Sequence, residues 1–282
     1  MMKPSTPPED DPSSIKYYVK RFILSQSAIF MGKTVVDVPA GQGVTSRILH
    51  EAGARVIPMD IFPQYFNVPE LACLPADLSQ RLPLDDQAAD HVFCQEGIEH
   101  LSDPMHAFRE FNRILKPAGR LFITTPNFSN LRCRLSYLLT ESERAGSVMP
   151  PNEANAVWFS DQDQKIYLGH IYLTGLQKLR VAGVLNGFAL RRVYFTRSRR
   201  SNLLLFPFLY PFIWAFSTLT YLKHRRKHRR DTARREVYKE VYKWAVHPGV
   251  LLDASLFVEW EKIRELAGMA AYLRSFSGEY CS

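Results

Sequence analysis

One nine-residue stretch, residues 35–43, constrains the fold of this chain more than any other. It reads Val-Val-Asp-Val-Pro-Ala-Gly-Gln-Gly, so two β-branched residues lead into Asp37 and a glycine-containing turn follows. Residues 44–52 behind the turn have the pattern of a helix. A strand, a tight loop and a helix N-terminus in this order are typical of α/β proteins that bind a nucleotide-like cofactor, because loop and helix amides can approach the ligand closely.

A second apolar run, residues 54–59, leads directly into Asp60. This is about the 20-residue distance at which nucleotide-binding units place a carboxylate that binds ribose hydroxyls. The two runs and the helix between them form a βαβ unit, which implies a parallel sheet with right-handed crossovers. Strand-like and helix-like segments keep alternating after it, and this alternation predicts a doubly wound α/β sheet.

The expected elements follow from hydrophobic periodicity and turn residues. Strands are expected at 33–38, 55–59, 90–95, 120–124, 188–195 and 254–262, with a further strand or edge at 71–75. Helices are expected at 15–30, 44–51, 104–115, 131–139 and 173–185, and a break is expected at 116–119. The last two strands are expected to pair antiparallel. The long connection from 126 to 170 is interpreted as a functional lid.

The composition is that of an ordinary globular protein, with 46% apolar and 23% charged residues in a chain of 282. Six of the charges behind the net charge of +8 lie in one basic run, residues 223–230. Four scattered cysteines without paired spacing indicate reduced thiols in a cytosol and no zinc site. The first 14 residues are rich in proline and acid, lack the features of a signal peptide, and are expected to be a flexible tail.

Residues 203–222 contain no charge and seven aromatic residues, and the basic run follows at once. By length alone this segment could span a bilayer. A single crossing would, however, separate two strands of one sheet, and residues 236–252 are a poor return span. We therefore expect the segment to lie in the membrane interface, with its arginines on anionic lipid. A buried helix or a homodimer interface is the alternative, and nucleic acid is disfavoured because the basic run lacks interleaved aromatics.

Four ordered motifs resemble class I S-adenosylmethionine-dependent methyltransferases. They are the loop at 37–43, Asp60, residues 95–104 with the sequence Glu-His-Leu-Ser-Asp-Pro at their end, and residues 113–121 with Leu-Lys-Pro-Ala-Gly. The last two are similar to the methyltransferase type 11 branch that contains ubiquinone-biosynthesis enzymes. The resemblance implies a Rossmann-like seven-stranded sheet whose last strand is antiparallel. It does not cover the apolar segment, which we expect to form a hydrophobic helical insert before that strand.

The same resemblance implies S-adenosylmethionine as cofactor and assigns residues to it. The expected cofactor-binding residues are Asp37, Pro39, Ala40, Gly41, Gly43, Asp60, Ile61, Asp77, Leu78 and Glu96. Among them, the glycines would let the backbone approach the amino-acid part, Asp60 would bind the ribose, Asp77 and Leu78 would flank the adenine, and Glu96 would face the methyl donor. Pro39 stands where the family usually has glycine, and we expect that the missing N–H is not needed for binding.

Methyl transfer is an in-line displacement, so alignment of donor and acceptor supplies much of the rate. If the acceptor must lose a proton, His100 and His170 are the candidate bases. A helix cap and a lid anchor are their alternative roles. Glu96 and Glu99 are paired carboxylates without metal-ligand spacing, so no metal site is predicted.

The sequence therefore predicts a flexible tail (1–14), a methyltransferase core (15–200) with a lid, a membrane-interface insert (201–248), and a last strand and C-terminal helix (249–282). The expected acceptor is lipid-linked or amphipathic, such as a glycolipid, a polyprenyl-linked sugar or a quinone precursor, at the cytoplasmic membrane face. A soluble methyltransferase with a dimerising insert and a non-catalytic cofactor-binding scaffold are the alternatives.

Overall fold

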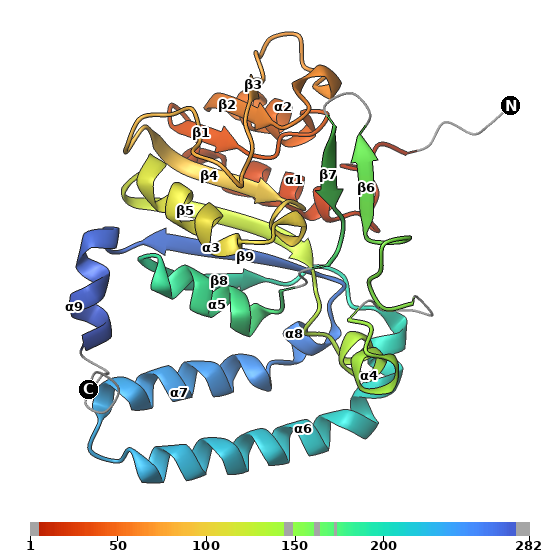
Figure 1. The fold of residues 1–282 in the computed structure, drawn as a ribbon, viewed down its shortest axis with the longest axis vertical. Coiled ribbons are helices and arrows are strands. Elements are labelled where there is room, and N and C mark those ends of the chain that lie inside the picture. The colour runs from red at the N-terminus through yellow and green to blue at the C-terminus, as the bar shows by residue number, and fades with distance from the viewer. Residues whose placement is uncertain (1–5, 144–148, 161–163, 172–173, 275–282) are drawn as a thin grey trace, which may run out of the picture.

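A seven-stranded sheet with the order β3-β2-β1-β4-β5-β9-β8 forms the centre of the computed structural model (Figure 1). The structure describes residues 6–143, 149–160, 164–171 and 174–274. The strands of this sheet are β1 (Thr34–Asp37), β2 (Arg55–Asp60), β3 (Leu74–Pro75), β4 (Ala89–Gln95), β5 (Leu115–Pro126), β8 (Phe188–Tyr194) and β9 (Ser255–Lys262). Strands β1 to β5 pair parallel, whereas β9 runs antiparallel to both β5 and β8. The predicted doubly wound sheet with an antiparallel last strand is confirmed.

Helices cover both faces of the sheet. They are α1 (Ile15–Ser25) and α2 (Val44–Glu51) on one face, and α3 (Pro104–Ile114) and α5 (Leu176–Leu185) on the other. Adjacent residues of β1 serve the two faces: Val35 packs in the core with α1 and α2, and Val36 packs in the core with α3 and α5. This alternation is the period-two pattern of a strand that is buried on both sides.

Strand β5 begins earlier than the sequence predicts. Residues 116–119 do not break the chain between α3 and the strand but lie within β5, where Ala118 adopts a left-handed φ of 60°. The register between β4 and β5 shifts between Ala89 and His91. A β-bulge therefore absorbs the Pro-Ala-Gly sequence that periodicity alone identifies as a break.

The connection expected to be a lid contains α4 (Leu131–Thr140) and a hairpin that the sequence analysis did not predict. Its strands are β6 (Val157–Ser160) and β7 (Lys165–Leu168), which pair antiparallel in a separate two-stranded sheet. Trp158 and Tyr167 stack across the hairpin with ring centroids 5.7 Å apart. The hairpin lies alongside the seven-stranded sheet in Figure 1, away from its core, so burial leaves little pattern in its sequence.

The insert between β8 and β9 consists of α6 (Arg200–Lys227), α7 (Thr232–Ala245) and α8 (Pro248–Leu252). Helices α6 and α7 lie side by side below the sheet in Figure 1. The Tyr221 and Tyr242 rings stack at 4.9 Å between them, and the Glu240 carboxylate of α7 pairs with Arg180 of α5 at 3.3 Å. One side of α6 thus packs against α7, which in turn packs against the core.

The first segment differs from the predicted flexible tail within residues 6–14. Glu9 is buried and pairs with Arg47 of α2 at 2.7 Å, and Asp10 pairs with Lys20 of α1 at the same distance. Ser14 then caps the N-terminus of α1. Composition alone assigns these acidic residues to a solvated tail. In the structure they form ion pairs that hold the segment against α1 and α2. At the other end, the short helix α9 (Met269–Arg274) follows β9.

A buried histidine on β4 makes the stability of the chain depend on pH. The side chain of His91 is buried and its Nε2 lies 3.1 Å from the Ile29 carbonyl oxygen. Burial lowers its pKa from 6.5 to about 4. Below pH 6.5 only the unfolded chain takes up this proton, so stability falls as the pH drops from 6.5 towards 4.

We expect His91→Gln to remove this loss of stability. Relative to the original chain, the variant should gain about 2 to 3 kcal/mol in the free energy of unfolding between pH 7.5 and pH 4.5. Urea unfolding of both proteins at the two pH values measures the change. If the free energies of unfolding of the two proteins differ by the same amount at both pH values, the prediction is contradicted.

Candidate functional site

A cavity of about 690 Å³ lies at the carboxyl ends of the parallel strands, beside the neighbouring strands β1 and β4. The sheet order reverses at this point, which is where doubly wound proteins bind their ligands. The loops after β1, β2, β3 and β4 and the hairpin strand β7 all contribute to its wall. The lining residues are Val38, Pro39, Ile61, Ala76, Asp77, Leu78, Ser79, Glu96, Gly97, His100, Leu101, Ser102, Gln164, Lys165, Ile166, Tyr167 and Leu168.

The loop after β1 needs glycine at two positions for different reasons. Gly41 and Gly43 both have positive φ, 54° and 88°. A β-carbon at Gly41 would face open space, whereas one at Gly43 would lie 2.5 Å from Val68 and 2.7 Å from Phe66. Gly41 therefore leaves the loop backbone open to a ligand, and Gly43 lets the segment after β2 pack against the loop.

Pro39, the residue that departs from the family pattern, forms part of the cavity wall. It follows Val38 through a cis peptide bond. Its ring packs over Gly97, where a β-carbon would lie only 2.5 Å from Pro39 Cδ. The glycine in the loop after β4 thus accommodates the proline in the loop after β1.

Asp60 joins the loops after β1 and β2. Its Oδ2 accepts a hydrogen bond from the Gly41 N–H at 2.7 Å, and its Oδ1 accepts one from the Phe62 N–H at 2.8 Å. Each carboxylate oxygen has a second lone pair, so both can still accept from ligand hydroxyls. Ala40, another expected cofactor residue, is held to the same region because its N–H donates to the Met59 carbonyl at 2.8 Å.

Asp37 lies beneath the loop and not on the cavity wall. It is 1% exposed, and its Oδ2 accepts a hydrogen bond from the Ser46 hydroxyl at 2.6 Å. Burial raises the pKa of Asp37 to about 7. The geometry thus links the end of β1 to the first turn of α2, so Asp37 orders the loop that carries Gly41.

Two glutamates follow β4. Glu96 has a left-handed φ of 48° and lines the cavity, and burial raises its pKa to about 7. Glu99 is 1% exposed and accepts a hydrogen bond from the Thr125 hydroxyl at 3.1 Å. Burial, with a smaller contribution from Glu96, raises the pKa of Glu99 to about 8.

The two histidines expected as bases lie together, although 70 residues separate them in the sequence. The ring centroids of His100 and His170 are 5.0 Å apart. His100 lines the cavity, and its Nδ1 lies 3.1 Å from the Leu168 carbonyl oxygen at the end of the hairpin. One donor atom each from Glu99, His100 and His170 lies within 4.8 Å of the other two.

Sequence analysis missed Glu99 as part of this cluster and missed the hairpin as part of the wall. The sequence pairs Glu99 only with Glu96, because the return of the chain at His170 cannot be inferred from local pattern. For the hairpin, the aromatic pair Trp158-Phe159 and the apolar pair Ile166-Tyr167 are the available signal. The ring centroids of Tyr167 and Phe62 are 5.1 Å apart, and this contact connects the hairpin to the loop after β2.

Comparison with known proteins covers the part of the site that the loops after β1 to β4 form. Residues 36–123 match the family described as "Methyltransferase domain". The ubiquinone biosynthesis O-methyltransferase of Xanthomonas oryzae pv. oryzae is 34% identical over 105 residues, which cover 34% of this chain and 44% of that protein. The protein of the same name from Xylella fastidiosa is 33% identical over 126 residues, which cover 42% of this chain and 49% of that protein. The chain thus spans slightly less than half the length of these relatives.

Solved structures match the fold over most of the chain. An S-adenosylmethionine-dependent methyltransferase from Archaeoglobus fulgidus has a TM-score of 0.53 and 14% identity, covering 90% of this chain and 97% of that one. A second, from Mesorhizobium loti, has a TM-score of 0.51 and 16% identity, with 90% and 100% covered. At these identities the likeness establishes the Rossmann-like fold.

Proposed function

We propose that this chain, which carries a class I S-adenosylmethionine-dependent methyltransferase domain, transfers the methyl group to an oxygen of a lipid-linked or amphipathic acceptor at the cytoplasmic face of a membrane. S-adenosylmethionine is the cofactor of this domain class. The observation that carries the proposal is the cavity at the switch point of the sheet, which opens between the cofactor loops and an aromatic hairpin. Glycolipids, polyprenyl-linked sugars and quinone precursors are acceptors of the proposed kind.

The residues on the cavity wall support the cofactor orientation that the motifs imply. Asp77 and Leu78 line the end of the cavity assigned to adenine, and Asp60 holds the loop beside it. The open backbone at Gly41 would receive the amino-acid part, which places the reactive methyl group near Glu96. When bound, S-adenosylmethionine supplies the sulfonium methyl group, and the chain's residues align an acceptor with it.

The hairpin brings apolar side chains to the cavity, and further apolar side chains are exposed on α4. Ile166 and Tyr167 of the hairpin line the wall, and the ring of Trp158 stacks on Tyr167. Helix α4 ends in exposed apolar residues, including Leu138 at 78% exposure, and it packs against the start of α6. The Arg132 N–H donates to the side chain of Asn202 at 2.9 Å in that contact. These surfaces suit an acceptor with a long apolar part.

Helix α6 provides the surface for membrane contact. It is the one helix in the described residues that is long and apolar enough to cross a bilayer, judged by length and composition. Phe208, Phe212 and Phe216, spaced four residues apart on its outer side, are 72%, 65% and 68% exposed. Both ends of the insert are tied to paired strands of one sheet, so a helix that lies in the interface fits the fold better than a span.

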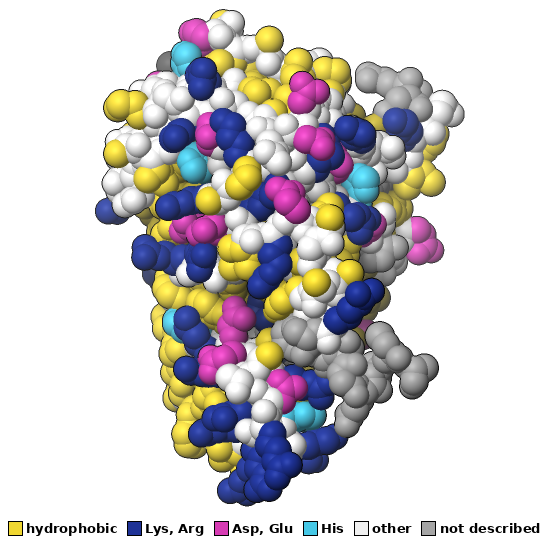
Figure 2. Space-filling view, turned by 90° about the vertical axis from the view of Figure 1, so that its left-hand side faces the viewer, with side chains coloured by type: hydrophobic (Ala, Val, Ile, Leu, Met, Phe, Trp, Pro, Cys, Tyr) yellow, Lys and Arg dark blue, Asp and Glu magenta, His cyan; other side chains and the backbone are white. Residues whose placement is uncertain are grey.

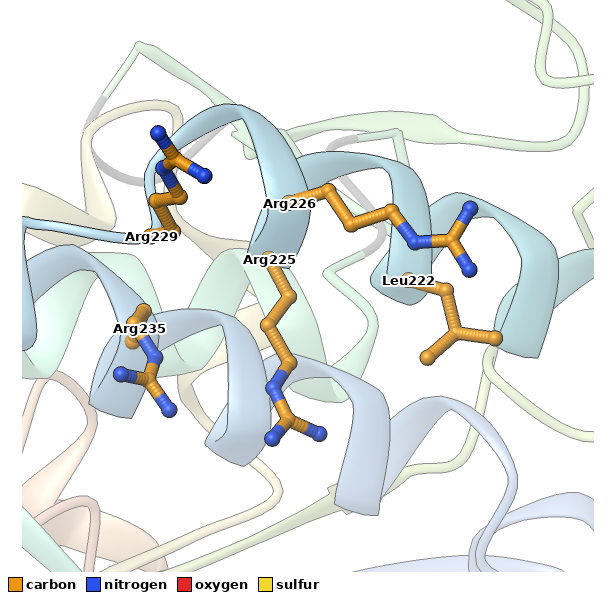
Figure 3. Close-up of a pocket in the computed structure, with 5 residues that line it drawn as sticks. All are labelled: Leu222, Arg225, Arg226, Arg229 and Arg235. Carbon is orange, nitrogen blue, oxygen red and sulfur yellow. The ribbon is translucent and has the colours of Figure 1, made fainter.

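Arginines gather where α6 meets α7. Arg225, Arg226, Arg229 and Arg235 surround a hollow of about 660 Å³ beside Leu222, and Figure 3 shows these side chains around the turn. In the part of the chain that the structure describes, no carboxylate forms an ion pair with any of the four. Figure 2 shows the same end of the molecule as a basic surface beside a hydrophobic edge. This combination suits an anionic leaflet, because each arginine near such a surface contributes about 1 kcal/mol.

The test is methyl transfer with labelled S-adenosylmethionine to fractionated membrane lipids, followed by mass analysis of the products. We expect the label in an amphipathic product that partitions with lipid. If the label is found only in a water-soluble product, the acceptor is not lipid-linked or amphipathic, and this part of the proposal is wrong. Cofactor binding without transfer to any fraction would support a scaffold and contradict enzymatic function.

A further inference from the structure

The cluster of Glu99, His100 and His170 at the edge of the cavity has the composition of a metal site. Its three donor atoms lie within 4.8 Å of one another and come from both sides of the cavity: a 3₁₀ turn at Ile98–His100 and the residues after β7. The Glu99 carboxylate is buried, and no Lys or Arg among the described residues pairs with it. A buried carboxylate is costly in such surroundings unless it is protonated, paired or bound to a metal.

Two of the three side chains are already oriented by neighbouring groups. The Thr125 hydroxyl donates to Oε2 of Glu99 at 3.1 Å. A carbonyl oxygen can only accept, so Nδ1 of His100 carries the hydrogen in its 3.1 Å contact with Leu168, and Nε2 keeps its lone pair. Metal-binding histidines and carboxylates are characteristically held by outer hydrogen bonds of this kind.

We propose that Glu99, His100 and His170 bind a divalent transition-metal cation at the acceptor side of the cavity. Two imidazole nitrogens and one carboxylate oxygen suit Zn²⁺, Mn²⁺ or Fe²⁺, whereas Mg²⁺ and Ca²⁺ prefer oxygen ligands alone. Ligands of tetrahedral Zn²⁺ lie about 3.4 Å apart, so donor atoms that lie up to 4.8 Å apart need to close by up to about 1.4 Å. Three protein ligands leave a fourth position, and His100 lines the cavity, so that position faces the acceptor.

This inference rests on the proposed function for its chemical consequence. A hydroxyl of the acceptor would occupy the fourth position and lose its proton to solvent water, because a bound cation lowers the pKa of a coordinated hydroxyl. The resulting oxygen attacks the sulfonium methyl carbon, the new C–O bond forms, and the electron pair of the breaking C–S bond stays on sulfur. The two histidines would then act as ligands, which revises the sequence-based expectation that one of them is the base.

The test is binding of Co²⁺ and Zn²⁺ to the untagged protein. Calorimetry measures the affinity of both ions, and visible absorption reports the ligands of bound Co²⁺. We expect one Co²⁺ per chain at micromolar or lower dissociation constant, without the charge-transfer band of a thiolate ligand. His100→Ala and His170→Ala should each weaken binding at least 100-fold, and Glu99→Gln should weaken it as well. Mg²⁺ should bind at least 100-fold more weakly than Co²⁺.

A matched control removes the other histidine pair with suitable spacing. His224 and His228 lie four residues apart at the end of α6, and His224→Ala/His228→Ala should leave Co²⁺ binding unchanged. Loss of binding in this control, or equal binding in the His100→Ala variant, would overturn the proposed site. S-adenosylmethionine binding by the metal-free original chain is measured separately. If the metal-free chain binds the cofactor and transfers methyl groups at an undiminished rate, the catalytic role of the cation is refuted and the proposed function stands. If the chain binds metal but transfers no methyl group, the proposed function is refuted.

Discussion

Asp60→Ala is expected to weaken S-adenosylmethionine binding at least 100-fold. The Asp60 carboxylate accepts from the backbone amides of Gly41 and Phe62, and each oxygen keeps a lone pair for the ribose hydroxyls that the family resemblance assigns to it. Hydrogen bonds to a charged group contribute about 1.5 to 3 kcal/mol each, so two ribose contacts account for a loss of this size. Isothermal titration calorimetry with the cofactor measures it.

Two comparisons separate ribose recognition from loop order. Asp77→Ala, a change on the cavity wall, should weaken binding less than tenfold, because the Asp77 carboxylate accepts from Ser79 within its own loop. A 2′-deoxy analogue of S-adenosylhomocysteine should bind more weakly than the parent compound to the original chain, but equally to Asp60→Ala. If the variant still discriminates between the two compounds, Asp60 does not contact the ribose.

The strand, loop and helix around Gly41 were predictable because their determinants are local. Helix α2 begins and ends where the sequence indicates, since Gly43 precedes it and Gly53 follows it. The antiparallel pairing of β8 and β9 also agrees with the prediction, and Leu190 of β8 pairs with the buried Trp260 of β9. Turn glycines, strand ends and hydrophobic patterns depend only on residues that are close together in the chain, so a single sequence is enough to identify them.

The hairpin side of the cavity was not predictable, because it depends on contacts between distant segments. His170 reaches His100 only because the chain after β7 returns to the loop after β4. The hairpin itself has little burial pattern: Phe159 and Ile166 are exposed. Pro39 is a further example, since the space that accommodates its ring is provided by Gly97, 58 residues later.

Phe208→Ser/Phe212→Ser is expected to reduce binding to phospholipid vesicles about 100-fold. Both rings lie on the exposed side of α6, and neither is required to hold α6 against α7, where Tyr221 stacks on Tyr242. Burial of an aromatic side chain is worth at least about 1.5 kcal/mol, so two rings contribute about 3 kcal/mol to partitioning. Flotation with vesicles that contain 30% or so of an acidic lipid gives the bound fraction.

The control for this change is Leu24→Ser/Met31→Ser, which removes two exposed apolar side chains outside the insert and should leave vesicle binding unaltered. A second variant, Arg225→Ser/Arg226→Ser/Arg229→Ser, should weaken binding about 100-fold on acidic vesicles and little on neutral ones, because its loss is electrostatic. If the original chain stays in the soluble fraction with both acidic and neutral vesicles, membrane contact is contradicted. If it is a dimer that Phe208→Ser/Phe212→Ser converts to a monomer, the exposed side of α6 is a subunit interface, and the acceptor must reach the cavity from solution.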